Sequence, residues 1–319
     1  MNNDISKLYD LISPSDNEML SRLSDSDIHD FLNLINQYKL VLRDGIGVNL
    51  DETFGVEIEC EYVKWEKIMR KVLKNWGLYD DTSLLCGAEL KSPKLRDIKE
   101  NWLQLKKMCS MLSKYSEIGI NCGGHVHVGI QALKDSRKSL INFMKLWSIY
   151  EHVIFRFSFG EFLGPRPVFK GNSKSVRDAF KEMCYYDSIG ALSERELFMM
   201  LKHDKCQAVN FRHYDTFKTI EFRCPNGTLN PVIWQNNINL FVKMLLYSSS
   251  LMYDERKIKE KMNSSFSDKT ASKIYVDDAL EFVDLIFDNN MDKIYFLRQY
   301  LKSFEVSDEY EIAKSFAKL

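Results

Sequence analysis

Apolar residues recur along this chain with two spacings, which predict a mixture of strands and helices. From residue 52 onwards, segments that alternate with a period of two are followed by longer segments with a helical period. We expect strands at residues 53–62, 86–90, 118–121, 125–130, 207–213 and 218–223. We expect the long helices at residues 65–76, 95–115, 136–157 and 231–251, the last with Pro231 near its start. The pattern therefore predicts an α+β fold.

The remaining pattern divides the chain into three parts. Residues 1–45 read as two amphipathic helices, and the second carries an apolar stripe through Ile28, Phe31 and Ile35. Residues 46–255 hold the alternating strands and helices and form the expected catalytic domain. Residues 256–319 are helical and charged, with a candidate linker at 263–273. We expect both terminal segments to pack on the central domain, so extra helices flank it at each end.

Composition excludes several classes of protein. The chain has 319 residues, of which 45% are hydrophobic, enough for a sizeable core. A net charge of −1 gives no bulk attraction to nucleic acid or anionic lipid, so we expect neither as a partner. No apolar run approaches the roughly 20 residues of a membrane span, and the acidic N-terminus lacks the pattern of a signal peptide. We therefore expect a cytoplasmic protein.

The cysteines do not form a recognisable framework. There are seven, an odd number, and no two are spaced as CxxC. Disulfide scaffolds and zinc ribbons need paired cysteines at such spacings. We interpret these residues as small buried thiols.

The candidate chemistry lies on three of the predicted strands, each apolar on one side and ionisable on the other. In FGVEIECE, residues 54–61, the glutamates Glu57, Glu59 and Glu61 share one side. In GHVHVG, residues 124–129, the same alternation places two histidines on one side, and TIEFRC, residues 219–224, adds an acid and an arginine. The residues concerned are His125, His127, Glu221 and Arg223.

These side chains are typical of a metal site. One charged strand would fit an ordinary solvated sheet face, but three such strands, one with a His-x-His, are harder to explain that way. Neighbouring carboxylates repel, and a bound cation would turn that repulsion into attraction. Several carboxylates suit Mg²⁺ or Mn²⁺, whereas two histidines also suit Zn²⁺, so spacing alone leaves the metal open. Glu61, at the end of its strand, fits a supporting position better than a ligand position.

Several nucleotide and hydrolase motifs do not occur. The chain has no GxxxxGK[ST], GxGxxG, GxSxG or HExxH. An enzyme of this kind that used ATP would therefore hold its phosphates mainly through metals and arginines. Arg223 offers a planar fork for a carboxylate or a phosphoryl group, or it pairs with Glu221.

Five motifs give the chain a family resemblance. They are FGVEIECE, GAELKSPKL at residues 87–95, NCGGHVHVG at 121–129, AVNF at 208–211 and KTIEFRCPNGTLNP at 218–231. In order and spacing, from residue 53 to residue 247, the chain resembles the amidoligases, carboxylate–amine ligases related to glutamine synthetase. The match departs at residues 80–83, where the chain reads Asp-Asp-Thr-Ser and the family often has Asp-Gly-Ser.

The resemblance implies a glutamine-synthetase-like fold, in which an antiparallel sheet curves around two or three Mg²⁺ or Mn²⁺ ions. It implies that ATP phosphorylates a substrate carboxylate and that an amine then displaces phosphate to form an amide. The substrates would be a small molecule or peptide with a carboxylate and an amine co-substrate, and the oligomeric state stays open.

The resemblance also implies a role for each matched residue. Glu59 and Glu89 would hold one metal, and Glu57, His125 and Glu221 the other. Arg223 would lie near the transferring phosphoryl group, so that Arg223, Glu57 and Glu221 form the catalytic set. The nucleotide and substrate contacts would come from His127, Arg166, Asn210 and Arg212.

Two other functions are open at this point. A zinc-dependent hydrolase built on His125, His127 and Glu221 would bind Zn²⁺ tightly and act without ATP. A non-catalytic relative of the ligases would bind nucleotide without turnover.

Overall fold

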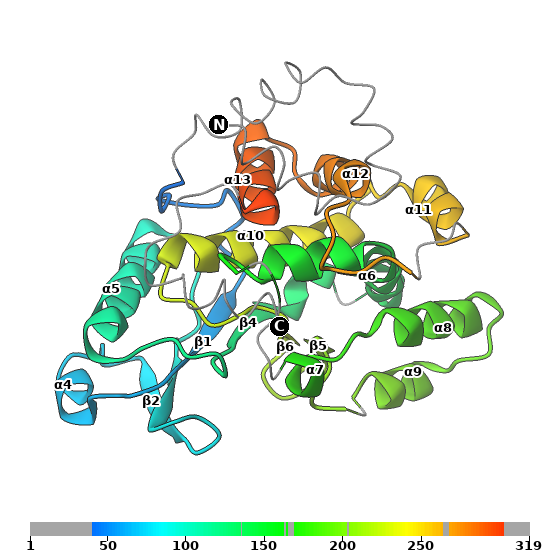
Figure 1. Cartoon of the computed structure of the whole chain (residues 1–319). Coiled ribbons are helices and arrows are strands. Elements are labelled where there is room, and N and C mark those ends of the chain that lie inside the picture. The colour runs from blue at the N-terminus through cyan, green and yellow to red at the C-terminus, as the bar shows by residue number, and fades with distance from the viewer. Residues whose placement is uncertain are drawn as a thin grey trace.

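The computed structural model describes residues 40–134, 136–162, 164, 169–202, 204–263 and 268–302 (Figure 1). Its strands are β1 (Phe54–Cys60), β2 (Gly77–Asp81), β3 (Gly87–Lys91), β4 (Gly124–Gly129), β5 (Val209–Asn210) and β6 (Thr219–Phe222). They form one antiparallel sheet of six strands in the order β2-β3-β1-β4-β6-β5. With described helices between and after these strands, the predicted α+β class is confirmed.

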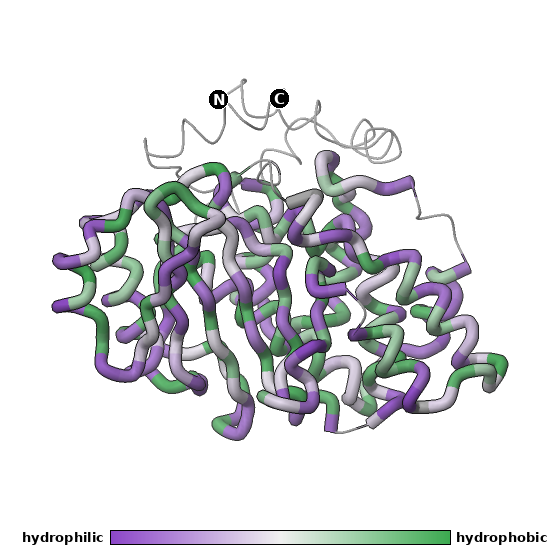
Figure 2. The backbone as a smooth tube through the Cα atoms, turned by 90° about the horizontal axis from the view of Figure 1, so that it is seen from below, coloured by the Kyte–Doolittle hydropathy of each residue, from purple (hydrophilic) through white to green (hydrophobic). Residues whose placement is uncertain are grey.

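One face of the sheet is apolar and fully buried. Ile58, Leu90, Val126 and Phe222 come from four neighbouring strands, and none is exposed to solvent. The helices α5 (Lys99–Tyr115), α6 (Arg137–Ser158) and α10 (Pro231–Ser248) supply many of the other residues of this core. In Figure 1, α6 and α10 lie above the strands, and α10 contacts both β1 and β4. Figure 2 shows the molecule from below the view of Figure 1, with the sheet toward the viewer, and hydrophilic and hydrophobic positions alternate along the strands.

Local sequence signals fix the two long helices. Ser136 caps α6 by accepting a hydrogen bond from the Ser139 N–H, and Asn230 caps α10 by accepting from the Val232 N–H. Pro231 occupies the first turn of α10, where its missing N–H costs no hydrogen bond. The Phe222 ring of β6 stacks on Phe241 of α10 with centroids 4.1 Å apart, which ties the helix to the sheet.

The other described helices are α4 (Trp65–Met69), η1 (Ile130–Leu133), α7 (Phe169–Asn172), α8 (Arg177–Ser188), α9 (Glu194–Leu201), α11 (Glu255–Met262), α12 (Val276–Ile286) and α13 (Asn290–Leu301). The last three all contact α6. A buried ion network joins α12 to α6: Asp278 accepts from His152 Nε2 at 2.7 Å and from the ammonium of Lys261 at 2.9 Å. The C-terminal helices are therefore packed on the central part of the chain by charge as well as by apolar contacts.

Three expectations for the first half of the chain are wrong. Residues 118–121 form no strand, because β4 pairs with β1 and β6 instead. The helix expected at 65–76 ends at Met69, and the chain then turns into β2. The strand β2 was not expected, since GLYDD has no alternating apolar pattern; it is an edge strand held by β3 alone.

Smaller differences concern element ends. The helix expected from residue 95 begins at Lys99, because Asp97 turns its carboxylate to the backbone N–H groups of Ile46 and Val48. The strand expected at 207–213 is reduced to Val209–Asn210. The other predicted strands and long helices agree with the structure to within about three residues.

Parts of the sequence prediction fall outside the described residues. The two amphipathic helices expected in residues 1–45 fall mostly in residues 1–39, which are not described; residues 40–45 are described and form no helix. Residues 264–267 of the candidate linker are not described either. In the rest of that linker, the Lys269 ammonium donates to Asp278 at 2.5 Å, and Ala271 packs against the core. These described linker residues are therefore fixed to the body of the protein.

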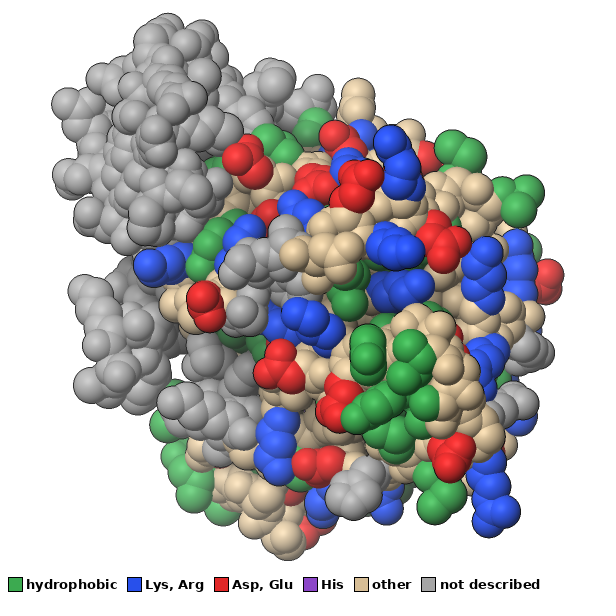
Figure 3. All heavy atoms as spheres, turned by 90° about the vertical axis from the view of Figure 1, so that its right-hand side faces the viewer, with side chains coloured by type: hydrophobic (Ala, Val, Ile, Leu, Met, Phe, Trp, Pro, Cys, Tyr) green, Lys and Arg blue, Asp and Glu red, His purple; other side chains and the backbone are tan. Residues whose placement is uncertain are grey.

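Surface properties agree with the composition. Within the described part of the chain, no helix is long and apolar enough to cross a membrane. Figure 3 shows the face on the right-hand side of Figure 1, where Lys and Arg side chains are interspersed with Asp and Glu. This face has no uniform basic surface of the kind that binds a phosphate backbone. All seven cysteines are described, and all are free thiols, five of them buried.

Candidate metal centre

The second face of the sheet gathers the ionisable residues of four neighbouring strands. Antiparallel pairing places Glu57 opposite His125, and Glu59 opposite Glu89. His127 lies opposite Glu221 in the next pair of strands. Residues directly opposite each other in a sheet point to the same face, so all six side chains converge. The alternation that predicts this face from sequence is thus realised across the whole sheet.

These side chains form two groups whose ligand atoms all lie within 4.8 Å of one another. One group is Glu57, Glu89 and His125, and the other is Glu57, His127 and Glu221. Glu57 belongs to both, because its two carboxylate oxygens point in different directions. Its Oε2 lies 2.9 Å from His125 Nδ1, and its Oε1 lies 3.3 Å from His127 Nε2. The face can therefore hold two cations that share one carboxylate.

Glu59 lies at the edge of the first group. Its Oε1 is 3.5 Å from His125 Nε2, and its Oε2 accepts a hydrogen bond of 2.5 Å from the Gly123 N–H. Glu61 has a different role. Its buried carboxylate accepts from the Leu85 N–H at 3.2 Å and so supports the turn that precedes β3. This agrees with the supporting position that its place in the strand predicts.

Two positively charged side chains, Lys91 and Arg223, lie among these carboxylates. The Lys91 ammonium on β3 lies 2.9 Å from Glu57 Oε1 and 2.7 Å from Glu89 Oε2. The Arg223 guanidinium forms an ion pair with Glu221, and its Nε donates to the Asn172 carbonyl at 3.2 Å. Arg223 therefore pairs with Glu221, as one of its two sequence interpretations predicts, while staying at the edge of the site.

The pKa values of two neighbouring carboxylates in the site, Glu89 and Glu57, shift in opposite directions. Burial raises the pKa of Glu89, and its hydrogen bond and charge interaction with Glu57 raise it further, to about 7. Burial also acts to raise the pKa of Glu57, but hydrogen bonds and charges from His125 and His127 outweigh it and hold that pKa well below its usual value. Of this pair, Glu89 is therefore the carboxyl that takes up a proton first as the pH falls.

The donor set fits a divalent metal. Nε2 of His125 and Nε2 of His127 are both buried, and their nearest carboxylate oxygens, on Glu59 at 3.5 Å and on Glu57 at 3.3 Å, do not satisfy them with well-formed hydrogen bonds. A buried nitrogen without a partner is costly unless a ligand satisfies it. Ligand atoms around Mg²⁺ at about 2.1 Å stand at most about 4.2 Å apart, so small side-chain adjustments would close either group around an ion. Carboxylates outnumber imidazoles in both, which favours Mg²⁺ or Mn²⁺.

The residues predicted to contact nucleotide or substrate differ in position and in hydrogen bonding. Asn210 lies opposite Glu221 in the sheet, but its side chain is bonded to the Lys205 carbonyl and the Arg212 N–H. It shapes the turn after β5 rather than offering a free amide. Arg212 is exposed next to it. Arg166 lies outside the described residues.

Two residues near the centre escaped the sequence analysis. Lys91 stands two positions after Glu89 in the same strand, so the alternation that identified the acids could have placed it on their face. His213 lies in the loop before β6, where its ring is 5.9 Å from that of His127. The strand expected at 207–213 would end at His213, but in the structure that strand ends at Asn210, so its alternation gives no guide to the position of this ring.

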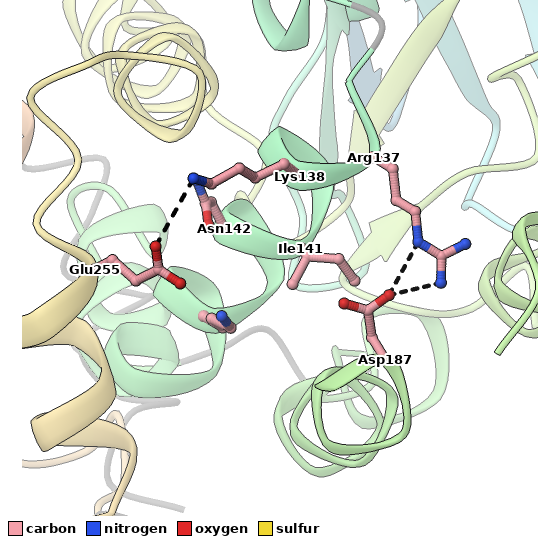
Figure 4. A pocket seen from close by; sticks show the side chains of 7 residues that line it. Arg137, Lys138, Ile141, Asn142, Asp187 and Glu255 are labelled. Carbon is pink, nitrogen blue, oxygen red and sulfur yellow. Dashed lines mark hydrogen bonds and ion pairs between the residues drawn. The ribbon is translucent and has the colours of Figure 1, made fainter. Parts of the chain in front are cut away.

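A separate cavity lies at the start of α6 (Figure 4). It has a volume of about 340 Å³ and shares no residue with the metal groups. Four of its charged groups are paired: Arg137 donates twice to Asp187, and the Lys138 ammonium lies 3.8 Å from Glu255. The carboxylate face of the sheet is therefore the stronger candidate for chemistry.

Comparison with known proteins agrees with this choice. Residues 66–156 match the model of a family described as "Putative amidoligase enzyme". The matched segment contains Glu89, His125 and His127, while Glu57, Glu59 and Glu221 lie outside it and join them through the sheet. No curated protein matches the chain significantly. The family match confirms the resemblance that the sequence motifs indicate.

Proposed function

From this resemblance to the amidoligases, we propose that the protein is an ATP-dependent carboxylate–amine ligase. The observation that carries the proposal is the shared position of Glu57, which lies between two groups of metal-ligand type on one sheet face. Phosphoryl transfer from ATP commonly uses two divalent ions at one site, and a bridging carboxylate suits such a pair. The family match adds independent support for ligase chemistry.

Mg²⁺ or Mn²⁺ would be held by Glu57, Glu59, Glu89, His125 and Glu221. His127, whose Nε2 belongs to the second group, would contribute either to that ion or to the nucleotide phosphates beside it. When bound, the ions would neutralise the charge on the phosphates and on the phosphoryl group in transfer.

The proposed reaction has two steps. In the first, an oxygen of the substrate carboxylate attacks the γ-phosphorus of ATP, the bond to the β,γ-bridging oxygen breaks, and ADP leaves with that electron pair. In the second, the amine nitrogen attacks the carbonyl carbon of the acyl phosphate, phosphate leaves, and the nitrogen loses a proton to give the amide. Such chemistry depends on positioning and charge more than on a protein nucleophile.

The cationic side chains would position the reactants. Arg223 lies at the edge of the second group with its side chain 20% exposed, so it can turn one N–H pair toward a phosphoryl oxygen while pairing with Glu221. Asn210, the last residue of β5, and Arg212, which follows it, would flank the nucleotide, Asn210 by holding the turn. We assign Arg166 to the substrate carboxylate by resemblance alone.

The geometry favours a ligase over a zinc hydrolase. A hydrolytic zinc site built on His125, His127 and Glu221 needs all three around one ion. Within the described ranges, the two histidines instead fall into separate groups, each with two carboxylates. Oxygen-rich groups of this kind suit harder ions than Zn²⁺.

The proposal is tested by ADP release. We expect Mg-ATP to be hydrolysed slowly or not at all by the protein alone, and ADP to form rapidly only when a suitable carboxylate and amine are both present. A panel of amino acids, peptides and polyamines covers small-molecule and peptide substrates. Rapid ester or amide hydrolysis in the absence of ATP would contradict the proposal.

A further inference from the structure

Lys91 bridges the two carboxylates of the first metal group from the side opposite His125. Its ammonium lies 2.9 Å from Glu57 Oε1 and 2.7 Å from Glu89 Oε2. His125 Nδ1 lies near the other oxygen of each, at 2.9 Å from Glu57 Oε2 and 3.8 Å from Glu89 Oε1. The two carboxylates are thus held between an ammonium and an imidazole.

The two bridging groups differ in exposure. The Lys91 side chain is 38% exposed, whereas that of His125 is 5% exposed. The ammonium therefore closes the solvent side of the group, and the imidazole forms its inner wall. The Lys91 ammonium lies over the Tyr79 ring, 5.8 Å from its centroid. A flexible four-carbon stem of this kind can swing outward without moving the strand.

Charge balance explains why a cation lies there. Glu57, Glu59, Glu89 and Glu221 face one another across neighbouring strands, and like charges opposite each other destabilise a sheet. Lys91 supplies one positive charge to Glu57 and Glu89, and Arg223 supplies another to Glu221. Each of the two groups thus has one positively charged side chain at its edge, Lys91 for the first and Arg223 for the second.

We propose that Lys91 is the resident counter-ion of the Glu57–Glu89–His125 group and is displaced when a divalent ion binds there. The ammonium and the ion are both positively charged and draw on the same two carboxylates, Glu57 and Glu89, so they compete. Lys91 thereby lowers the affinity of the group for metal and keeps the carboxylates paired when no metal is present. The inference rests on the metal-binding part of the proposed function and is independent of ATP and of the ligase reaction.

Titration with Mn²⁺ at pH 8, followed by calorimetry or by the spin-resonance signal of free Mn²⁺, tests the competition. Lys91→Met keeps most of the aliphatic side chain and removes the charge. Because the Lys91 ammonium is close to the carboxylates but partly exposed to solvent, we expect the variant to bind Mn²⁺ about tenfold more tightly than wild type. Lys91→Arg keeps the charge and should stay within about threefold of wild type. Lys99→Met, which removes an exposed ion pair with Asp44, is the matched control and should leave the affinity unchanged.

A second measurement uses the wild-type protein and so does not depend on the folding of a variant. Brief acetylation of lysines with and without saturating Mg²⁺, read by mass spectrometry, reports how free each ammonium is. We expect Mg²⁺ to increase the labelling of Lys91 several-fold and to leave that of Lys99 unchanged.

Each outcome bears on the proposal. Equal or weaker Mn²⁺ binding by Lys91→Met would overturn it, as would Mg²⁺-independent labelling of Lys91. Failure of wild type to bind any divalent ion would overturn both this inference and the metal-dependent function. Tighter binding by Lys91→Met without any ligase activity would support the counter-ion and count against the ligase alone.

Discussion

Glu57 on β1 and His125 on β4 lie directly opposite each other in the sheet, with Glu57 Oε2 2.9 Å from His125 Nδ1. The other oxygen of Glu57 faces His127, two residues further along β4. A single carboxylate therefore joins the two groups of the centre, which makes Glu57 the residue on which both depend.

Replacing Glu57 should remove metal binding at both groups together. Glu57→Gln keeps the size of the side chain but loses the charge and one oxygen ligand, and we expect Mn²⁺ to bind at least about 100-fold more weakly. Glu66→Gln, at an exposed position of α4, serves as the control and should bind as wild type does. Calorimetric titration measures both. Near-normal stoichiometry and affinity in Glu57→Gln would show that the groups are not metal sites.

Metal affinity should fall as the pH decreases below 7. The pKa of Glu89 is raised to about 7 by burial and by the neighbouring Glu57, and a metal ion must displace the proton that Glu89 carries. Below this pH we expect the apparent affinity for Mn²⁺ to fall by up to about tenfold per pH unit. Titrations between pH 6 and pH 8 measure the slope, which should be shallower for Glu89→Gln. An identical slope in that variant would exclude Glu89 as the controlling group.

The close contact between β4 and α10 predicts a specific cost at Gly124. A Cβ built on Gly124 would lie 2.2 Å from the Trp234 ring, which is fully buried and cannot move aside. Gly124→Ala should therefore destabilise the protein by about 1–3 kcal/mol. The matched control is Gly171→Ala, where the added methyl group meets no atom within 4 Å. Urea denaturation compares the two, and equal stability of both variants would contradict the packing described here.

Asp278 should contribute strongly to stability. Burial acts to raise its pKa, but His152, Lys269 and Lys261 outweigh it and hold the pKa well below the ordinary value of 3.8. The ionised form therefore stabilises the fold above about pH 3.8, and this contribution is lost as the pH falls through the lower pKa of the folded state. We expect Asp278→Asn to lose about 2–4 kcal/mol at pH 7, because it leaves the buried His152 and the partly buried ammonium groups of Lys261 and Lys269 without their carboxylate.

The control for Asp278 lies on the same helix. Asp284 pairs with Lys293 but is 66% exposed, so Asp284→Asn should change stability by less than about 0.5 kcal/mol. Urea unfolding at pH 7 and again below pH 3.8 measures both variants. The gap between wild type and Asp278→Asn should narrow at the acid pH, and a gap that is absent at pH 7 would refute the role of the network.

Sequence could predict the candidate site largely because its residues follow strict alternation. In β1, β4 and β6 the ionisable residues all fall at alternate positions, and the pleat alone sends those side chains to one face. Sequence could not predict which ligands would group together. The resemblance implies Glu59 with Glu89 around one ion, whereas the structure groups Glu89 with Glu57 and His125. That grouping depends on strand register, which is set by long-range pairing.

The errors in the fold have a similar origin. The segment at 118–121 has an apolar pattern but no free partner, since both edges of β4 are already taken by β1 and β6. β2 has a poor pattern but a free edge of β3 to pair with. In both cases the availability of a neighbouring strand outweighed local preference, as is usual for β-structure.

The measurement that tests the central claim most directly is Mg²⁺-dependent ATP binding, detected as a shift in the temperature of thermal unfolding. Wild type, Glu57→Gln and His125→Ala would be compared with Mg-ATP, with ATP alone and with Zn²⁺. At 100 times the dissociation constant, a ligand stabilises the folded state by about 2.7 kcal/mol, which raises the melting temperature by several degrees. The account predicts this shift for wild type with Mg-ATP and its loss in both variants. No shift with Mg-ATP, together with tight Zn²⁺ binding through His125, would contradict it.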